Sequence, residues 1–513
     1  MSAGDWRFWS ALVAATIVLN FSAAAADQCD NGQDPDAAIL DCTKGILSGR
    51  GKGRYLAGLY NNRAAAYRAR GDNDRAMADL NEAIRLDPKL AMAYNNRGAA
   101  FNEQGDNDRA IADYNEAIRL DPKLAMAFAN RGNAYSDKDD YDHAIADLNE
   151  AIRLDPTFAV AFQNRGSAYH DKGDNDRAIA DYSEAIRLDP KRTKAFLGRG
   201  IAFSDKDDND RAIADFDEVI RRDPKSDVAF YHRGSAYHDK GDDDRAIADY
   251  NAAIRIDPAD ARFFNGRAEA YHAKGDNDRA IADFTEAIRI NPKSVRAFAG
   301  RADLIADKGD YDRGIADYNE AIRLNPEYSK AFVGRGLIFS TKGDFDRATA
   351  DYNEAIRLNP KSSLAHFARG RSYLLAGSLE KALADFNEAS AIAPEAAYVV
   401  LWTDIVRQRS HLPSRLAQTS AKLDMKAWPA PVIRLFMDQM TPAGLLGAAD
   451  DPDPAKKKSH VCEANFYSAE RSLTKGLKDE AIRLFRLAAS DCPRSSDERD
   501  AASTELKALG VTP

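Results

Sequence analysis

A fixed 34-residue period runs through most of this chain. Proline recurs ten times, each time 34 residues after the one before. The ten positions are Pro88, Pro122, Pro156, Pro190, Pro224, Pro258, Pro292, Pro326, Pro360 and Pro394. Such a period is typical of a linear array of stacked units, each of which buries its apolar face only against its neighbours. The array excludes a single compact enzyme core for most of the molecule.

One unit, residues 91–124, shows the pattern within the period. Small and aromatic residues stand at positions 4, 8, 11, 20, 24 and 27, which are Tyr94, Gly98, Phe101, Ala110, Tyr114 and Ala117. The first three share one face of a helix, and the last three share one face of a second helix. Gly105 suits the left-handed end of the first helix, Asp106 can cap the second, and Pro122 ends it. Each unit is therefore predicted to be an antiparallel helix pair.

This spacing resembles the tetratricopeptide repeat (TPR), and the resemblance covers ten tandem units over residues 57–396 without an insertion. It implies an all-α solenoid, a right-handed superhelix of antiparallel helix pairs whose first helices line the concave side. Two units carry Asp139 and Asp207 where the others have Gly at position 15. Asp tolerates the left-handed region better than most residues, so we expect the same turn there.

The first 26 residues read as an export signal. An apolar run from Phe8 to Phe21 is short for a membrane span, and the alanines after it supply a cleavage site between Ala26 and Asp27. An uncleaved anchor is the alternative. A cleaved signal predicts a periplasmic or secreted protein with no membrane span after cleavage.

The four cysteines form two close pairs, one at each end of the array: Cys29 with Cys42, and Cys462 with Cys492. In an exported protein, such pairs predict disulfides, and four free thiols are the alternative. Neither pair has C-x-x-C spacing, so no metal site is expected. The first pair falls in a capping segment, residues 27–56. The second falls in residues 462–513, which read as an isolated final TPR unit followed by a C-terminal helix.

Between these parts, residues 397–461 lose the period and read as a degenerate helical segment. Prolines divide it into expected helices, with a polar connector before the final unit. The helices are expected at 398–409, 413–426, 432–440 and 442–449, and the connector at 450–458.

The block 398–509 resembles the C-terminal part of the NlpI-type periplasmic TPR lipoproteins. The residues that carry the resemblance are Leu401, Trp402, Trp428, Val432, Ile433, Phe436, Asn465, Phe466, Tyr467, Phe485, Arg486, Leu487, Ala488, Glu505 and Leu506. Members of that family act as adaptors for envelope proteases and cell-wall enzymes, so the resemblance implies partners of that kind. No lipobox precedes Cys29, so no lipid anchor is expected.

Charge and motifs narrow the function further. The net charge is −9 and no basic stripe is present, which argues against nucleic acid as a partner. The chain contains no H-E-x-x-H, no G-x-S-x-G and no G-x-G-x-x-G that opens a helix after a strand. We therefore expect neither an enzyme nor a cofactor.

Two positions are the same in all ten units: Arg at position 7 and Asp at position 23. In an antiparallel hairpin, positions whose numbers sum to about 31 face each other, and these nearly do. The pattern predicts partly buried Arg–Asp pairs, for example Arg97–Asp113, Arg131–Asp147 and Arg199–Asp215. The alternative is that the arginines bind an anionic ligand.

Positions 2, 5, 6, 9, 12 and 13 of each unit are expected to line the concave groove. Asparagine recurs at two of these positions. Position 6 holds Asn62, Asn96, Asn130 and Asn164, and position 5 holds Asn61 and Asn95. An amide both donates and accepts hydrogen bonds, so one per unit can hold the backbone of an extended peptide. Solvated side chains with no ligand are the alternative. Four histidines are further candidates for groove-lining residues: His170, His232, His238 and His272.

Later units are more apolar in the groove, through Tyr231, Leu337, Phe367 and Leu374, and predict a second partner surface. Together these features predict a non-catalytic exported scaffold or adaptor that binds extended protein segments in its groove. A scaffold in envelope polysaccharide or peptidoglycan metabolism is the alternative.

Overall fold

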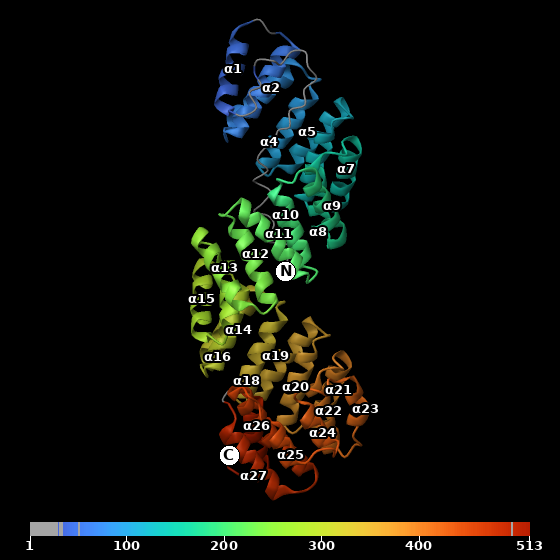
Figure 1. The fold of residues 1–513 in the computed structure, drawn as a ribbon, viewed down its shortest axis with the longest axis vertical. Coiled ribbons are helices and arrows are strands. Elements are labelled where there is room, and N and C mark those ends of the chain that lie inside the picture. Colours follow the sequence, from blue (N-terminus) through green and yellow to red (C-terminus); the bar gives the residue numbers. More distant parts are fainter. Residues whose placement is uncertain (1–28, 30–33, 50–51, 494–495, 513) are drawn as a thin grey trace. The chain divides into compact units, whose positions relative to one another are not determined.

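The computed structural model describes residues 29, 34–49, 52–493 and 496–512, and all regular secondary structure in these residues is helical. The chain divides into two compact units, Met1–Asp257 and Pro258–Pro513, which we describe separately. Figure 1 labels many of the helices in each unit. The predicted signal peptide, residues 1–26, lies outside the described residues. No helix in the described ranges is both long enough and apolar enough to cross a membrane.

The first unit contains the capping helix α1 (Pro35–Leu47) and six helical hairpins. The hairpins are α2 (Arg54–Ala69) with α3 (Asn73–Leu86), α4 (Ala91–Glu103) with α5 (Asn107–Leu120), α6 (Ala125–Ser136) with α7 (Tyr141–Leu154), α8 (Ala159–Asp171) with α9 (Asn175–Leu188), α10 (Thr193–Ser204) with α11 (Asn209–Arg222), and α12 (Asp227–Asp239) with α13 (Asp243–Ile256).

The second unit continues with four hairpins and a C-terminal segment. The hairpins are α14 (Ala261–Ala273) with α15 (Asn277–Ile290), α16 (Val295–Asp307) with α17 (Tyr311–Leu324), α18 (Ser329–Thr341) with α19 (Phe345–Leu358), and α20 (Ser363–Leu375) with α21 (Leu379–Ile392). The C-terminal segment comprises α22 (Ala397–Arg409), α23 (Leu416–Thr419), a 3₁₀ turn (Ser420–Lys422), α24 (Ala430–Phe436), α25 (Pro442–Ala448), α26 (Pro454–Thr474), α27 (Lys478–Asp491) and α28 (Asp497–Ala508).

The turn inside each hairpin follows from the residues predicted to make it. Gly105 adopts φ = 79°, and the Asp106 carboxylate then accepts a hydrogen bond from the Arg109 amide at 3.1 Å, which caps α5. Asp139 and Asp207 adopt φ = 61° and 60°. The prediction that Asp preserves the left-handed turn at these two positions is confirmed.

Close approach of the two helices depends on the small residue at position 8. A Cβ atom added at Gly98 would lie 2.8 Å from the ring of Tyr114, which is itself 1% exposed. The ring therefore fills the space that a larger side chain on α4 would need. Exclusion of water from this contact supplies the apolar part of each hairpin's stability.

Successive first helices pack against one another within each unit, whereas successive second helices make no comparable contact in the described part of the chain. The first helices in contact are α2, α4, α6, α8, α10 and α12 in one unit, and α14, α16, α18 and α20 in the other. Closer approach on one side curves each array, with its first helices inside. We call the surface formed by positions 2, 5, 6, 9, 12 and 13 of these helices the inner face.

Two predictions in the C-terminal segment are wrong. Residues 413–426 form only the short α23 and a 3₁₀ turn, and residues 450–458 are not a simple connector because α26 begins at Pro454. The Asp453 carboxylate accepts a hydrogen bond from the Ala455 amide at 2.8 Å, which caps the helix. Proline at the first helical position fits such a start because its missing N–H would have no partner there.

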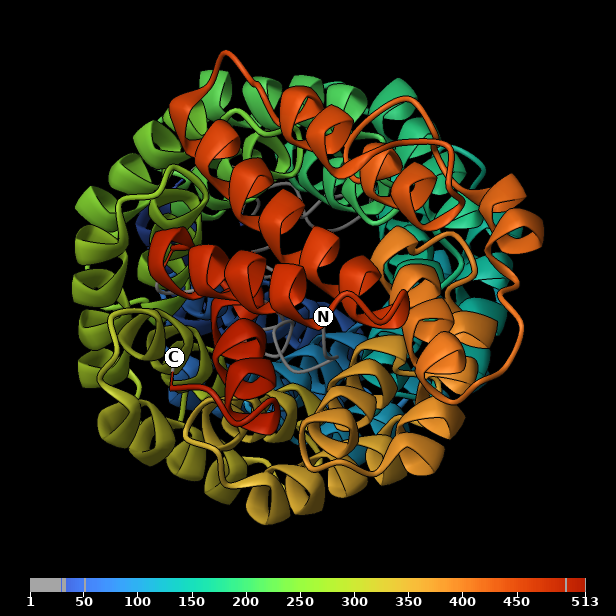
Figure 2. The same cartoon turned by 90° about the horizontal axis from the view of Figure 1, so that it is seen from below.

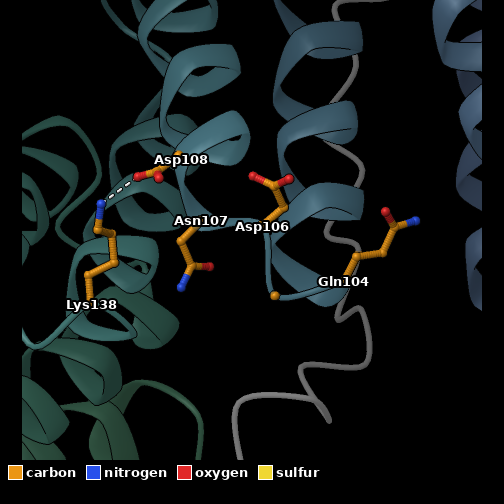
Figure 3. Close-up of a pocket in the computed structure, with 6 residues that line it drawn as sticks. Gln104, Asp106, Asn107, Asp108 and Lys138 are labelled. Carbon is orange, nitrogen blue, oxygen red and sulfur yellow. Dashed lines mark hydrogen bonds and ion pairs between the residues drawn. The ribbon is translucent and has the colours of Figure 1, made fainter.

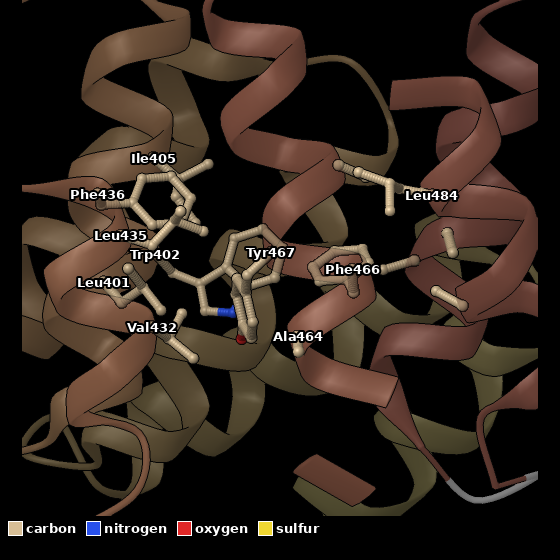
Figure 4. Packing of buried hydrophobic residues seen from close by; sticks show 14 of the residues in the cluster. Leu401, Trp402, Ile405, Val432, Leu435, Phe436, Ala464, Phe466, Tyr467 and Leu484 are labelled. Carbon is tan, nitrogen blue, oxygen red and sulfur yellow. The ribbon is translucent and has the colours of Figure 1, made fainter. Parts of the chain in front are cut away.

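The C-terminal helices form their own apolar core, in which α22, α24, α26 and α27 meet (Figure 4). The Trp402 ring lies 5.8 Å from Phe466 and 6.1 Å from Tyr467, measured between centroids. Figure 2 shows the red C-terminal helices against the orange helices of the last repeat, and α28 contacts α20. The chain's own C-terminus therefore covers part of the inner face. Phe367 and Leu374, predicted to belong to a partner surface, pack against this core instead.

Candidate functional site on the inner face

The structure brings each predicted Arg–Asp pair together as a two-point contact. The Arg97 guanidinium donates to both carboxylate oxygens of Asp113 at 2.7 and 2.8 Å, and Arg199 does the same to Asp215 at 2.8 Å twice. Arg131 donates to Asp147 at 2.7 and 2.6 Å. The same contact occurs in the other seven units, in the pairs Arg63–Asp79, Arg165–Asp181, Arg233–Asp249, Arg267–Asp283, Arg301–Asp317, Arg335–Asp351 and Arg369–Asp385.

These arginines also bind the preceding unit. Nη1 of Arg97 donates to Asn81 at 2.9 Å, and Nη1 of Arg199 donates to the Ser183 hydroxyl at 3.0 Å. The hydrogen bond to Asp113 raises the pKa of Arg97. All three guanidinium nitrogens of Arg97 therefore donate hydrogen bonds within the protein. These contacts do not favour the alternative that the arginines bind an anionic ligand.

The asparagines bind one another across successive repeats. Nδ2 of Asn96 donates to Oδ1 of Asn61 at 2.9 Å, and Nδ2 of Asn130 donates to Oδ1 of Asn95 at 3.0 Å. Within a unit, Asn61 donates to Asn62 at 3.2 Å, and Asn95 donates to Asn96 at 3.4 Å. A continuous chain of amides therefore joins three units, and the position 5 members, 4% and 1% exposed, face the neighbouring helix rather than solvent.

Asn164 does not continue this amide chain. Its side chain forms no hydrogen bond with any described residue, and the next unit carries Gly198 at position 6. A Cβ atom at Gly198 would lie 2.5 Å from the ring of Tyr182. The Tyr182 ring, at position 24 of the preceding unit, therefore packs directly against the backbone of α10 at Gly198.

The four predicted histidines do not converge on one site. His238 lies 2.6 Å from Asp243, and His272 lies 3.0 Å from Asn277, each in the turn of its own hairpin. His232 stacks on Phe216 with centroids 5.8 Å apart. No group of three or more potential metal ligands occurs among the residues that the structure describes.

His170 links two repeats, because its Nε2 lies 2.8 Å from a carboxylate oxygen of Asp205 in the next unit. Burial lowers the pKa of His170, but hydrogen bonds with Asp171 and Asp205 outweigh it and raise the pKa to about 9. The same hydrogen bond lowers the pKa of Asp205. The pair is therefore charged at neutral pH.

This link belongs to a pattern that sequence reasoning missed. Position 12 of one unit pairs with position 13 of the next in Arg68–Glu103, Asn102–Asp137 and His170–Asp205. The separation of 35 residues is the available signal, since a donor is followed 35 residues later by a carboxylate. These pairs fix polar side chains across the inner face.

A second missed pattern lies at the hairpin turns, away from the inner face. Lys138 donates to Asp108 of the preceding unit at 2.5 Å, beside an open polar hollow of 440 Å³ that Figure 3 shows. Equivalent contacts occur at Lys172–Asp142, Lys206–Asp176, Lys240–Asp210, Lys308–Asp278 and Lys342–Asp312. Asp108 and its equivalents are exposed, so each pair contributes little stability.

Both cysteine pairs are joined as disulfides in the structure. The Cα atoms lie 4.8 Å apart in Cys29–Cys42 and 4.9 Å apart in Cys462–Cys492. The second bond connects α26 to the residue that follows α27, so it closes the last hairpin.

Charged groups also hold the C-terminal helices together. Arg409 on α22 donates to the fully buried Glu470 on α26 at 2.6 Å and to Glu505 on α28 at 2.7 Å. Glu463 accepts from the Tyr398 hydroxyl at 2.6 Å and from Trp428 Nε1 at 2.9 Å. These contacts are internal to the C-terminal segment and serve its packing.

An array of ten helical hairpins with a curved, polar inner face defines a helical-repeat solenoid. Three family models match this chain, and they are described as TPR repeat or tetratricopeptide repeat. The matched residues are 64–105, 98–139, 132–173, 166–207, 234–275, 265–329, 299–348, 333–397 and 194–226. The chain therefore belongs to the tetratricopeptide-repeat proteins.

Comparison with other proteins gives distant similarity. No curated protein matches the chain. A TPR protein from Parabacteroides merdae is 20% identical, with 48% of this chain and 98% of that one covered, at a TM-score of 0.42. Yeast Tom70 is 18% identical, with 75% of this chain and 95% of that one covered, at a TM-score of 0.40. YrrB, described as a TPR protein with an unusual peptide-binding site, is 26% identical. The match covers 38% of this chain and 97% of that one, at a TM-score of 0.32.

The buried Arg199–Asp215 pair is expected to show strong energetic coupling. Arg199→Ala, Asp215→Ala and the double variant form a cycle, in which we expect a coupling free energy of about 2 kcal/mol, because each single change leaves a poorly solvated charge behind. Urea unfolding measures it. Arg187 and Glu184, whose side chains are 67% and 34% exposed, form the matched control, whose coupling should be much weaker because water screens the pair. Additive effects at Arg199 and Asp215 would contradict the interpretation.

His170 is expected to contribute stability that depends on pH. Its pKa is about 9 when folded, against an ordinary value of 6.5, so the contribution is complete below pH 6.5 and disappears as the pH rises through 9. The difference in unfolding free energy between wild type and His170→Gln should thus be about 3 kcal/mol larger at pH 6 than at pH 10. In an Asp205→Asn background, this pH-dependent part should fall by half or more; an unchanged value would refute the assigned partner.

Proposed function

We propose that this chain is an exported, non-catalytic TPR scaffold that binds extended protein segments along its inner face. The observation that carries the proposal is that polar groups of the inner face are held in place before any ligand arrives. The amide chain from Asn62 to Asn130 and the pairs between positions 12 and 13 fix donors and acceptors across successive repeats. Side chains already ordered lose less conformational entropy on binding.

Binding then depends on many modest contacts rather than one deep pocket. The first helices present similar groups once per repeat, so a segment that spans several repeats adds their contributions. Asn61 and Asn95 take an indirect part, since they orient Asn96 and Asn130 and do not themselves face a ligand.

Export is the second part of the proposal. The apolar run ending in alanines at Ala26 and the two disulfides support a periplasmic or secreted location, where thiols are oxidised. Mass spectrometry of the protein from the extracellular or periplasmic fraction tests this. A chain that retains residues 1–26 or four free thiols in that fraction would contradict it.

The resemblance of residues 398–509 to NlpI-type proteins supports an adaptor role in the cell envelope. On this proposal, envelope proteases or cell-wall enzymes are the partners, and the C-terminal segment or the inner face receives them. The compact core around Trp402 makes the segment a rigid surface, as docking of a folded partner requires.

Photo-crosslinking tests where the partner binds and what it is. Benzoylphenylalanine at Asn133, at position 9 of α6, should give adducts in envelope extract, whereas the same residue at Glu116, on the outer helix α5, should not. Protease should degrade the attached partner. Adducts removed by a muramidase instead would support a peptidoglycan scaffold, and equal adducts at both positions would contradict binding along the inner face.

A further inference from the structure

The helix α28, which lies against the inner face of α20, is held there by small apolar side chains and by polar contacts. The buried apolar residues that it adds to the C-terminal core are Ala501, Ala502 and Leu506. Hydrophobic stabilisation grows with the apolar area that is buried, and an alanine buries little. The attachment of α28 therefore depends strongly on polar contacts, one of which joins Glu505 to Arg409 on α22.

This contact belongs to a group with one positive and two negative charges. The Arg409 guanidinium donates to Glu505 at 2.7 Å and to both carboxylate oxygens of Glu470, on α26, at 2.8 and 2.6 Å. Glu470 is completely buried, and the side chains of Arg409 and Glu505 are 16% and 12% exposed. Two carboxylates that share a poorly solvated place cannot both ionise easily, so one of them holds its proton to a higher pH.

The helices around Glu470 supply no second cation. Among the described residues, the charges that act on Glu470 are those of Arg409 and Glu505. The charged side chains of α27 are exposed, and α25 contains none. On α24, Arg434 donates to a backbone carbonyl, and on α26 itself Arg471 is paired outside the group. The excess negative charge is therefore compensated most readily by a proton.

The pKa of Glu470 shows which carboxylate takes that proton. Burial raises this pKa from its ordinary value of 4.5, the charge of Arg409 partly opposes the rise, and Glu505 adds to it, so the pKa lies at about 7. At lower pH, Glu470 is neutral and Arg409 neutralises Glu505. At higher pH, the proton leaves to solvent, and ionised Glu470 competes for the guanidinium and repels Glu505. Because the folded pKa is raised, the stabilisation is lost as the pH rises through about 7.

We propose that Arg409, Glu470 and Glu505 form a pH-sensitive latch, which holds α28 against α20 when Glu470 is protonated and loosens it when Glu470 is ionised. In the closed state, the chain's own helix covers part of the inner face. Loosening of α28 uncovers the surface of α20 for a protein segment. That consequence rests on the proposed function, whereas the latch itself is a property of the chain alone.

Hydrogen exchange of the full-length chain at pH 6 and pH 8 tests the latch. After correction for the intrinsic exchange rate at each pH, the amides of α28 should be protected about fivefold less at pH 8, because two ionised carboxylates then repel each other. The amides of α15, a repeat helix of the same unit, are the internal reference and should change little. Protection of α28 that is equal at both pH values, or higher at pH 8, would overturn the inference.

Glu470→Gln and Glu505→Gln each remove one of the two negative charges and keep the size of the side chain. In both variants, the protection of α28 should be the same at pH 6 and pH 8; if Glu470→Gln does not fold, Glu505→Gln decides. Asp438→Asn is the matched control. It removes a carboxylate that pairs with Arg471 and Lys475 of α26 and whose pKa is about 2, so the pH dependence should remain. A pH dependence that persists in either folded Gln variant would overturn the assignment of the latch residues.

Hydroxyl-radical footprinting of the same samples measures whether α20 is uncovered. Oxidation of the peptide that contains Phe367 and Leu374 should rise from pH 6 to pH 8 in the wild type and stay constant in Glu505→Gln. Faster exchange of α28 without added oxidation would overturn the control of the inner face. Both measurements need no ligand, so an absence of inner-face adducts at Asn133 would contradict the proposed function and leave the latch in place.

Discussion

The arginine at position 7 is the side chain on which the array most depends. Its guanidinium holds the aspartate of its own hairpin with two nitrogens, and its third nitrogen reaches the second helix of the preceding hairpin. One residue therefore fixes both the angle within a repeat and the contact between repeats. Because the aspartate is buried, neither partner can be removed without leaving a charge in a poorly solvated place. The repetition of this contact explains how hairpins with small apolar cores stack regularly.

The local rules of the hairpin were readable from the sequence. Proline spacing, the glycine or aspartate at position 15 and the aspartate cap each act within a few residues, so their geometry follows from residue type. The prediction that Arg97 lies opposite Asp113 needed only the antiparallel packing of the two helices. The start of α26 was misjudged because proline was interpreted as a break, although Asp453 caps a helix that tolerates Pro454 in its first turn.

Contacts between repeats were much harder to predict. The asparagines were interpreted as ligand groups because their spacing was visible, but their partners lie 35 residues away, and only the packing of first helices brings them together. The covering of α20 by α28 depends on the path of the whole C-terminal segment, which has no period to follow. Phe367 and Leu374 consequently read as exposed in sequence and are packed in the structure.

The two disulfides have a consequence for how the protein comes apart. A linear array in which each repeat contacts only its neighbours loses order most readily at its ends, where a hairpin has one neighbour instead of two. Cys29–Cys42 and Cys462–Cys492 close the segments at those two ends. In an oxidising compartment, fraying is thereby opposed where it would begin, and reduction of the two bonds would remove this restraint from both ends.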